Sequence, residues 1–273
     1  MMTFVFMLFW ACYTALFIWL FDAFSLDVLN AIIWLLSLIV GFILAVLTML
    51  IPYIFYGRLQ KGDQTMNRRN HRFIGAVLPL IMRLLRIKLH ISGQENIPAD
   101  RNFILMANHQ SYYEVVVLKH LIKQPMVYIA KRPVFTWPII GHWAKLIGNI
   151  PIDKLADRSA AEAIIKGVRQ YKKGAVVAIF PEGKRSFSNT MNPMRPGAFK
   201  LATKPKAPIL VATLYDFHKV WRGWPFKRAH LRVHFHPVIE HADYEDLNTV
   251  GLASQVQAMI ETQIESFETE KNG

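Results

Sequence analysis

The first 57 residues contain two long apolar runs that strongly restrict how the chain can fold. Thr3–Phe21 spans 19 residues and Ala31–Ile51 spans 21 residues, and neither run contains a charged side chain. A helix rises about 1.5 Å per residue, so each run is long enough to cross the roughly 30 Å hydrocarbon core of a bilayer. We therefore expect residues 1–57 to form a transmembrane hairpin of two helices, with residues 22–30 as the turn between them.

The distribution of charge predicts how this hairpin is oriented. Asp22 and Asp27 are the only charged residues before residue 58, whereas all 32 Lys and Arg and the other 17 acids follow, giving residues 58–273 a net charge of +15. Basic segments next to membrane helices favour the cytoplasmic side. We therefore expect both termini, and the rest of the chain, on the cytoplasmic face of the inner membrane.

Two other interpretations of the apolar runs remain open. A cleaved signal peptide would begin with basic residues and have a shorter apolar core, and Met1-Met2-Thr3 contains no basic residue. A buried helix pair of a soluble protein is the second alternative. Runs of this length that carry Trp10, Trp19 and Trp34 are more typical of lipid-facing helices.

Residues 58–90 differ in character from the runs before them. Phe73–Lys88 combines apolar residues with Arg83, Arg86 and Lys88 at roughly helical spacing. Such a segment can lie in the membrane interface and direct its cations toward anionic headgroups. We expect an interfacial amphipathic segment here; an ordinary core helix with a solvated basic edge is the alternative.

Residues 91–273 are expected to form one α/β domain, in which a central mixed sheet is flanked by helices. Short apolar runs, typical of strands, alternate with longer mixed stretches, typical of helices. The run at 231–236 alternates with period two and predicts a half-exposed edge strand. Strands are expected at 103–107, 126–130, 175–180, 208–214 and 231–236, and helices at 111–123, 158–173, 197–204 and 246–271. Functional side chains are then expected where strands end.

A histidine and a glutamate follow the first of these strands, in Asn108-His109-Gln110-Ser111-Tyr112-Tyr113-Glu114. Ser111 and Glu114 have the spacing of a capping box, which predicts Ser111 as N-cap and places His109 two residues before it. A carboxylate beside an imidazole stabilises its protonated form, so His109 could act as a general base. The alternative is that Glu114 only caps the helix and His109 is an ordinary loop histidine.

Two further loops have the composition of anion-binding sites. Phe180-Pro181-Glu182-Gly183-Lys184-Arg185-Ser186 follows another expected strand, and its glycine, cations and hydroxyl suit a phosphate group. Gly148-Asn149-Ile150-Pro151-Ile152-Asp153-Lys154 is similar in character. A solvated basic loop explains either composition as well.

The sequence lacks the motifs that are typical of several other kinds of site. The sequence contains no Walker A, GxGxxG, CxxC or HExxH motif, and Cys12 is its only cysteine. His234 and His236 share one face of an expected strand, but neighbouring residues match no familiar ligand spacing. We therefore expect neither a metal nor a resident cofactor.

Together these segments resemble the glycerolipid acyltransferase family. Four blocks match in order: residues 108–114, 148–154, 180–186 and 207–211. Glu114 stands where the family more commonly has aspartate, and Lys154 where arginine is usual. Lys184 replaces a threonine, while Pro151 and Val211 also depart from the common residues. Upstream, residues 92–98 look like the family's entrance to the domain.

The resemblance implies an activity and roles for particular residues. A fatty acyl group would move from acyl-CoA or acyl-carrier protein to the free hydroxyl of 1-acylglycerol-3-phosphate, giving phosphatidic acid. His109 would accept the hydroxyl proton, with Glu114 orienting it. The remaining implied substrate-binding residues are Lys131, Lys154, Glu182, Gly183, Lys184, Arg185 and Ser186. Membrane lipids, lysophosphatidate and the acyl thioester are the expected partners.

Two rival functions remain. An acyltransferase for another lysolipid, such as lyso-ornithine lipid or lysophosphatidylglycerol, would use the same motifs. A membrane-tethered nucleic-acid-binding protein would explain the basic excess, and residues 221–228 mix cations with aromatic side chains as such sites do. The same mixture fits a membrane-contact loop, and no nucleic-acid-binding motif supports this rival. We therefore expect no nucleic-acid partner.

Overall fold

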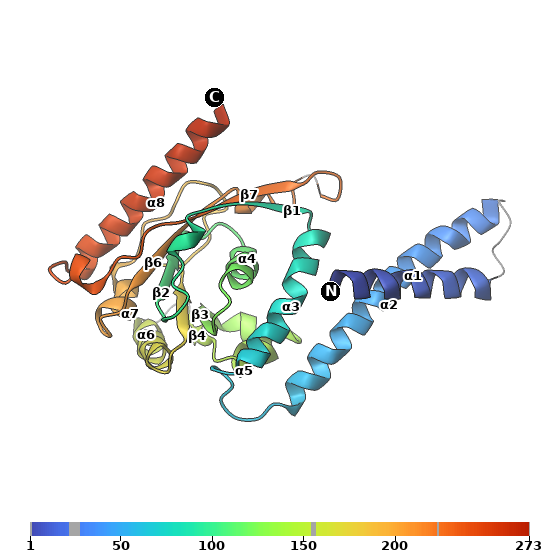
Figure 1. The fold of residues 1–273 in the computed structure, drawn as a ribbon, viewed down its shortest axis with the longest axis horizontal. Coiled ribbons are helices and arrows are strands. Elements are labelled where there is room, and N and C mark those ends of the chain that lie inside the picture. The colour runs from blue at the N-terminus through green and yellow to red at the C-terminus, as the bar shows by residue number, and fades with distance from the viewer. Residues whose placement is uncertain (1, 22–27, 154–156, 223, 273) are drawn as a thin grey trace. The chain divides into compact units, whose positions relative to one another are not determined.

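The computed structural model describes residues 2–21, 28–153, 157–222 and 224–272 (Figure 1). The chain forms two compact units, Met1–Lys61 and Gly62–Gly273. The finer boundaries expected from the sequence, after residues 57 and 90, stay predictions.

The first unit consists of two apolar helices, α1 (Met2–Leu20) and α2 (Val28–Leu59). The indole N–H of Trp10 donates a hydrogen bond to the carbonyl of Leu38, 2.9 Å away. At Gly41, an added Cβ would lie only 2.6 Å from the hydroxyl oxygen of Thr14. Glycine at this position therefore permits close packing of the two helices, as small residues do between membrane helices.

Both helices are long and apolar enough to span a membrane. The expectation of two long apolar helices is confirmed, and their insertion into a bilayer stays a prediction. Most of the expected turn, residues 22–27, lies outside the described residues. Residues 28–30 do not belong to that turn but form the first turn of α2.

Helix α3 (Arg68–Leu84) opens the second unit. The side chain of Asn67 caps it by accepting hydrogen bonds from the N–H groups of Arg69 and Asn70. The helix ends before the position expected from the sequence, because Ile87 and Lys88 already belong to a strand. The interfacial position of this segment stays a prediction.

A seven-stranded mixed sheet forms the centre of the second unit, in the order β1-β7-β6-β2-β5-β3-β4. Strands β6 and β7 pair antiparallel, and the other neighbours pair parallel. The strands are β1 (Ile87–Ser92), β2 (Ile104–Ala107), β3 (Met126–Lys131), β4 (Ile150–Ile152), β5 (Val176–Ile179), β6 (Ile209–Tyr215) and β7 (Ala229–Phe235). The expected α/β class with a mixed sheet is confirmed.

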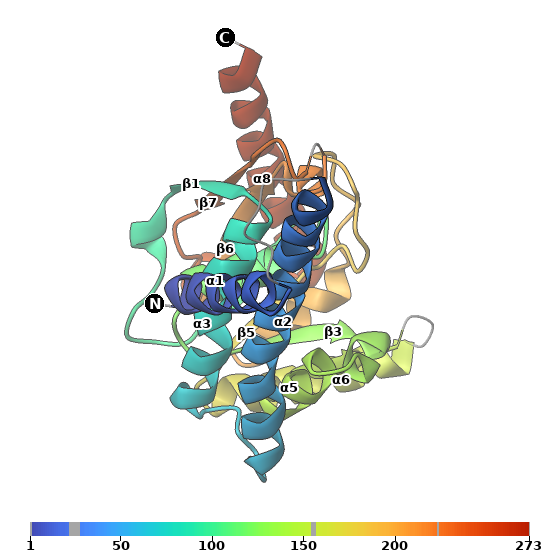
Figure 2. The ribbon, with the colours of Figure 1, turned by 90° about the vertical axis from the view of Figure 1, so that its right-hand side faces the viewer.

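Helices cover both faces of this sheet (Figure 1). One face packs against α6, α7 and α8, and the other against α3 and α4. Helix α6 lies along β3, β4 and β5 (Figure 2). The remaining helices are α4 (Glu114–Leu121), α5 (Ile140–Leu146), α6 (Asp157–Lys172), α7 (Lys200–Thr203) and α8 (Thr249–Asn272). Short 3₁₀ turns occur at Gln94–Asn96, Arg132–Thr136, Pro196–Phe199, Phe217–Lys219 and His241–Asp243.

The prediction that β7 is an edge strand is wrong. Its burial alternates as expected, with Leu231 and Val233 buried and His230 exposed. However, β1 pairs along its outer side, with Ile87 opposite Ala229, and so forms the edge. The alternation arises because one side of β7 packs into the core, which says nothing about how many strands flank it.

The sheet topology positions the site. Strands β2 and β5 are parallel neighbours, so their carboxyl ends lie at the same edge of the sheet. The segments that follow them, residues 108–114 and 180–186, therefore emerge side by side.

Candidate active site

His109 lies in the loop between β2 and α4, and the segment after β5 holds it from two sides. Its backbone N–H donates to Oε1 of Glu182 at 2.7 Å, and its carbonyl accepts a hydrogen bond from the N–H of Ser186 at 2.8 Å. The ring of Phe180 stacks on the imidazole, with 4.2 Å between the ring centroids. The structure thus brings together two of the segments singled out by sequence.

Glu114 is fully buried at the first residue of α4. Its carboxylate accepts hydrogen bonds from the N–H of Gln110 at 2.7 Å, from the N–H of Ser111, and from the hydroxyl of Ser111 at 3.0 Å. Burial raises the pKa of Glu114, and these hydrogen bonds act in the opposite direction. The carboxylate is held rigidly, facing the loop that carries His109.

The expected capping arrangement is wrong in one respect. The N-cap is Tyr113, not Ser111, so His109 lies farther from the helix than predicted. The hydroxyl of Ser111 accepts the N–H of Tyr113 at 3.1 Å and donates to Glu114, which closes the turn before the helix begins. The reciprocal half of the capping box, from the Ser111 N–H to Glu114, is present.

Nδ1 of His109 lies 3.8 Å from Oε2 of Glu114. This separation is too long for a hydrogen bond, but it would allow a charge interaction if the imidazole became protonated. Nδ1 is buried and has no hydrogen-bond partner among the described residues. The carboxylate of Glu114 is therefore positioned to accept a hydrogen bond from Nδ1–H if the two groups move closer. The geometry brings the two residues together without showing their catalytic roles.

Electrostatics keep the imidazole uncharged. Burial, and then the positive charges of Arg185 and Lys131, lower the pKa of His109 to about 3. The ring is therefore neutral near pH 7 and carries one nitrogen that can accept a proton. The side chain is 19% exposed, and Nδ1 is a buried ring nitrogen.

Glu182 acts here as a structural brace. Its Oε1 accepts the N–H of His109, and its Oε2 accepts both the backbone N–H and the side-chain amide of Asn192, each at 2.8 Å. The side chain is buried, and burial raises the pKa of Glu182. These bonds tie the segment at 180–186 to the His109 loop, while its expected part in substrate binding stays a prediction.

Arg185 has a donor available for a ligand. Its guanidinium carbon lies 3.7 Å from the ring centroid of Tyr112 and 4.9 Å from that of Phe187, so two aromatic rings hold it in place. Its Nη1 is buried and has no hydrogen-bond partner among the described residues. Buried donors are rarely left unpaired, which makes this one a candidate contact for an anion.

The other residues of this segment differ in accessibility. Lys184 is exposed, and the hydroxyl of Ser186 donates to the carbonyl of Ser188 at 2.8 Å. Gly183 has a positive φ of 70°, and an added Cβ would lie 3.0 Å from Nε of Arg195. Sequence reasoning missed Arg195, because it lies outside the motif and reaches Gly183 only in the fold.

Lys131 and Lys154 were also expected at the site. Lys131 ends β3, at the same sheet edge as His109, and its charge acts on the imidazole. Lys154 lies outside the described residues. The preceding Asp153 pairs with Arg132, whose Nη2 lies 2.6 Å from Oδ2 of Asp153, so this acid of the motif is bound to a cation that sequence reasoning did not single out.

Buried amides fix the His109 loop to the sheet, and sequence reasoning assigned them no role. Asn108 makes two hydrogen bonds of 2.8 Å to the backbone of Leu214, accepting its N–H and donating to its carbonyl. Gln110 donates to the same carbonyl at 2.9 Å and accepts the N–H of Phe217. Only the adjacency of Asn108 and Gln110 to His109 could have indicated this function.

The two histidines considered as metal ligands, His234 on β7 and His236 just after it, each contact a hydroxyl group. Nδ1 of His234 lies 2.8 Å from Oγ of Ser92, and Nε2 of His236 lies 2.8 Å from Oγ1 of Thr213. Across the described residues, no group of three or more His, Cys, Asp or Glu side chains could hold a metal ion.

Known proteins resemble this chain over the part that contains the candidate active site. Residues 88–214 match the family model described as Acyltransferase. A chloroplastic 1-acyl-sn-glycerol-3-phosphate acyltransferase of Brassica napus, BAT2, is 32% identical over 154 residues, which cover 56% of this chain and 44% of the relative. The chain thus spans less than half the length of that plant protein.

Bacterial relatives align over more of their length. The 1-acyl-sn-glycerol-3-phosphate acyltransferase of Borreliella burgdorferi is 27% identical over 194 residues, 70% of this chain and 78% of the relative. That of Bacillus subtilis is 27% identical over 191 residues, 69% and 92%. The crystal structure of the acyltransferase PlsC from Thermotoga maritima shares the fold, with a TM-score of 0.65 and 21% identity over 79% of this chain and 87% of that one.

Proposed function

Because residues 88–214 match the family model described as Acyltransferase, we propose that this chain transfers a fatty acyl group to the free hydroxyl of 1-acylglycerol-3-phosphate, giving phosphatidic acid. The observation that carries the proposal is the neutral imidazole of His109, which faces the buried carboxylate of Glu114 beside the unpaired donor of Arg185. The names of the Brassica, Borreliella and Bacillus relatives support the acceptor.

In the proposed first step, Nε2 of His109 accepts the proton of the acceptor hydroxyl. Nδ1–H then points toward Glu114, whose negative charge stabilises the imidazolium that forms. Apo structures often show such contacts as long, and the 3.8 Å separation would shorten once the ring is charged.

In the second step, the acceptor oxygen attacks the thioester carbonyl of acyl-CoA or acyl-carrier protein. The carbon–sulfur bond breaks, and the imidazolium returns its proton to the departing thiolate. The new ester is phosphatidic acid, and the side chains return to their starting protonation states. The acyl group passes directly from sulfur to oxygen, so the reaction needs no covalent intermediate on the protein.

Arg185 is the residue proposed to bind the acceptor phosphate. Its guanidinium is fixed between two aromatic rings, so little side-chain entropy is lost when it binds. Lys131, Lys154, Lys184 and Ser186 would add positive charge or hydrogen bonds, and Gly183 and Glu182 would shape the loop. The membrane supplies an acceptor with an acyl tail, which suits a chain whose two N-terminal helices are long and apolar enough to span it. We propose that the active site faces the cytoplasm, where the thioester is made.

The test is acyl transfer from radiolabelled acyl-CoA, or from acyl-carrier protein, by the full chain in a mild detergent. We expect phosphatidic acid from 1-oleoylglycerol-3-phosphate, at a kcat/KM at least tenfold above that for lysophosphatidylglycerol or lyso-ornithine lipid. Equal or better use of an acceptor without a phosphomonoester would establish the rival lysolipid function. Absence of transfer from either donor to any of the three acceptors would contradict acyl transfer itself.

A further inference from the structure

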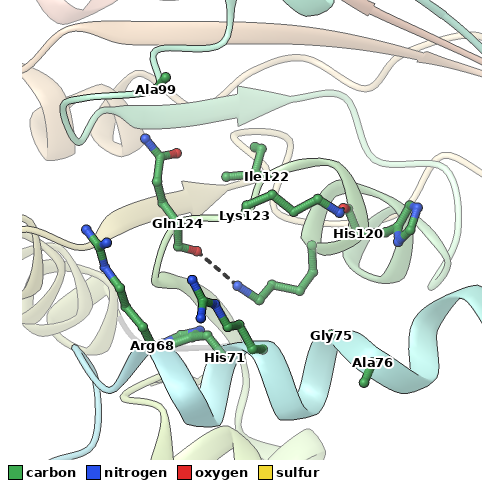
Figure 3. Close-up of a pocket in the computed structure, with 11 residues that line it drawn as sticks. Arg68, His71, Gly75, Ala76, Ala99, His120, Ile122, Lys123 and Gln124 are labelled. Atoms are coloured by element: carbon green, nitrogen blue, oxygen red, sulfur yellow. Dashed lines mark hydrogen bonds between the residues drawn. The ribbon is translucent and has the colours of Figure 1, made fainter. Parts of the chain in front are cut away.

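A cationic cavity lies within the second unit, at the end of α4 away from the candidate active site. Its volume is about 530 Å³, and α3 and the end of α4 line it (Figure 3). Helix α4 begins at Glu114, beside the carboxyl end of β2, and ends just before β3 begins. The cavity therefore lies toward the opposite edge of the sheet from His109.

The lining is strongly basic. Arg68 and Arg72 are one turn apart on α3, Lys119 lies in the last turn of α4, and Lys123 follows that helix. Figure 3 shows Arg68 reaching from α3 toward Gln124 on the opposite wall. The lining contains no acidic residue, and none of these four cations forms an ion pair with an acid of the described chain. Like charges four residues apart destabilise a helix, as Arg68 and Arg72 do on α3, and a bound anion would relieve that repulsion.

Of the four cations, Lys119 has the most unusual environment, because it is buried without a carboxylate beside it. Its side chain is only 7% exposed, and its ammonium group donates to a single protein acceptor, the carbonyl of Gln124, at 3.0 Å. An ammonium group has three N–H donors, and a buried cation normally has a carboxylate beside it. Burial, and then the charge of Lys123, lower the pKa of Lys119 to about 8. The site is therefore short of negative charge.

The environment of His71, which also lines the cavity, likewise lacks negative charge. His71 lines the cavity, is buried, and lies 2.7 Å from the carbonyl of Thr65 through its Nε2. Burial, and then the charge of Lys119, lower the pKa of His71 to about 4. His71 is thus neutral, and the positive charge comes from the lysines and arginines.

The cavity also has room for a ligand. Gly75 lines it on α3, and a Cβ added there would meet nothing within 4 Å. The first turn of α3, where Arg68 begins the helix, adds the positive end of a helix dipole. Two guanidinium groups beside two ammonium groups match the oxygens of a phosphate better than a single carboxylate.

We propose that this cavity binds a phosphate group, carried either by a lipid headgroup or by a soluble phosphate compound. The volume exceeds that of phosphate alone and accommodates an attached glycerol or sugar. The site is separate from the one proposed for the acceptor of acyl transfer, because it uses none of the same residues.

The test is calorimetric titration of the full chain in an uncharged detergent, at constant ionic strength set with sodium chloride. The two probes are sodium phosphate and mixed micelles containing dioleoylphosphatidylglycerol. Saturable binding of a probe that is lost when the cavity is filled by Gly75→Leu supports the proposal, and comparison of the two probes shows whether the phosphate comes from a headgroup or from solution. Saturable binding of neither probe would overturn it.

Variants assign the binding to the cavity. The double variant Arg68→Gln/Arg72→Gln should weaken the affinity at least tenfold, and Gly75→Leu should do so by filling the space without removing charge. Arg83→Gln, which removes an exposed arginine from the same helix outside the cavity, should stay within twofold of the wild type.

A last set of variants separates the two sites. Lys119→Met should abolish binding if the variant folds, as judged by circular dichroism; Gly75→Leu provides the test if it does not. In His109→Ala and Arg185→Ala, the phosphate binding that Gly75→Leu removes should keep its wild-type affinity. Loss of binding in Arg185→Ala together with wild-type affinity in Gly75→Leu would place the phosphate in the active site and overturn the proposal.

Discussion

The backbone N–H of His109 donates a 2.7 Å hydrogen bond to the carboxylate of Glu182, 73 residues away in the sequence. The same carboxylate accepts two bonds from Asn192, so one buried acid joins the His109 loop, the segment after β5 and the residues that follow. The position of the imidazole therefore depends on a residue from a different strand end.

Glu182→Gln should weaken this brace. An amide has one acceptor oxygen, so its NH₂ group would face either the N–H of His109 or the donors of Asn192. We expect a loss of about 1–3 kcal/mol in the free energy of unfolding and a lower kcat. Denaturant unfolding and steady-state kinetics measure the two effects. A variant as stable and as active as the wild type would show that the carboxylate is dispensable.

Glu114→Gln should separate charge from packing. Glutamine keeps an oxygen to accept the N–H groups of Gln110 and Ser111, so the turn before α4 should survive. Without the negative charge the imidazolium loses stabilisation, and kcat should fall roughly 100-fold or more while the acceptor KM changes little. A change confined to KM would indicate that Glu114 acts on substrate binding instead.

Arg185→Ala should chiefly weaken acceptor binding. A lost hydrogen bond to a charged group costs about 1.5–3 kcal/mol, which corresponds to a rise in the acceptor KM of roughly 10- to 100-fold. Arg83→Ala, at an exposed position on α3, is the matched control and should leave KM unchanged. An unchanged KM in Arg185→Ala would remove this residue from the phosphate site.

The lowered pKa of His109 has a consequence for acid stability. Unfolded, the imidazole has a pKa near 6.5, whereas burial and the nearby cations lower the folded value to about 3. The unfolded state binds the extra proton below pH 6.5, so this group takes stability away as the pH falls from 6.5 toward 3. His109→Gln should therefore lose less stability than the wild type between pH 6.5 and pH 4.

Imidazole NMR measures the same pKa directly. Titration of the labelled histidines, with His109→Gln used to assign the resonance, should show His109 neutral down to pH 4. Titration of that resonance near pH 6.5 would contradict the buried, cation-flanked environment.

Much of the fold follows from local sequence patterns. The two apolar runs, the strands at β2, β3, β5 and β6, and the long helices α6 and α8 were expected from hydrophobic periodicity, because these elements have continuous buried faces. Strands β1 and β4 were missed. β1 follows a basic helix after two residues and is mostly exposed, and β4 has three residues and contains Pro151.

The site was expected only in part. His109 and the motif from Phe180 to Ser186 were singled out because both follow strands, and the parallel pairing of β2 with β5 brings them together. The brace formed by Glu182 and the contact of Arg195 with Gly183 depend on long-range packing, which no local pattern encodes.

The most direct test of the central claim is acyl transfer to 1-oleoylglycerol-3-phosphate by the wild type and by His109→Ala, both purified in the same detergent and both shown to be folded. The account predicts phosphatidic acid from the wild type and a rate lower by a factor of roughly 100 to 10,000 in the variant, the usual contribution of a general base. Substantial turnover by His109→Ala would contradict the proposed role of the imidazole.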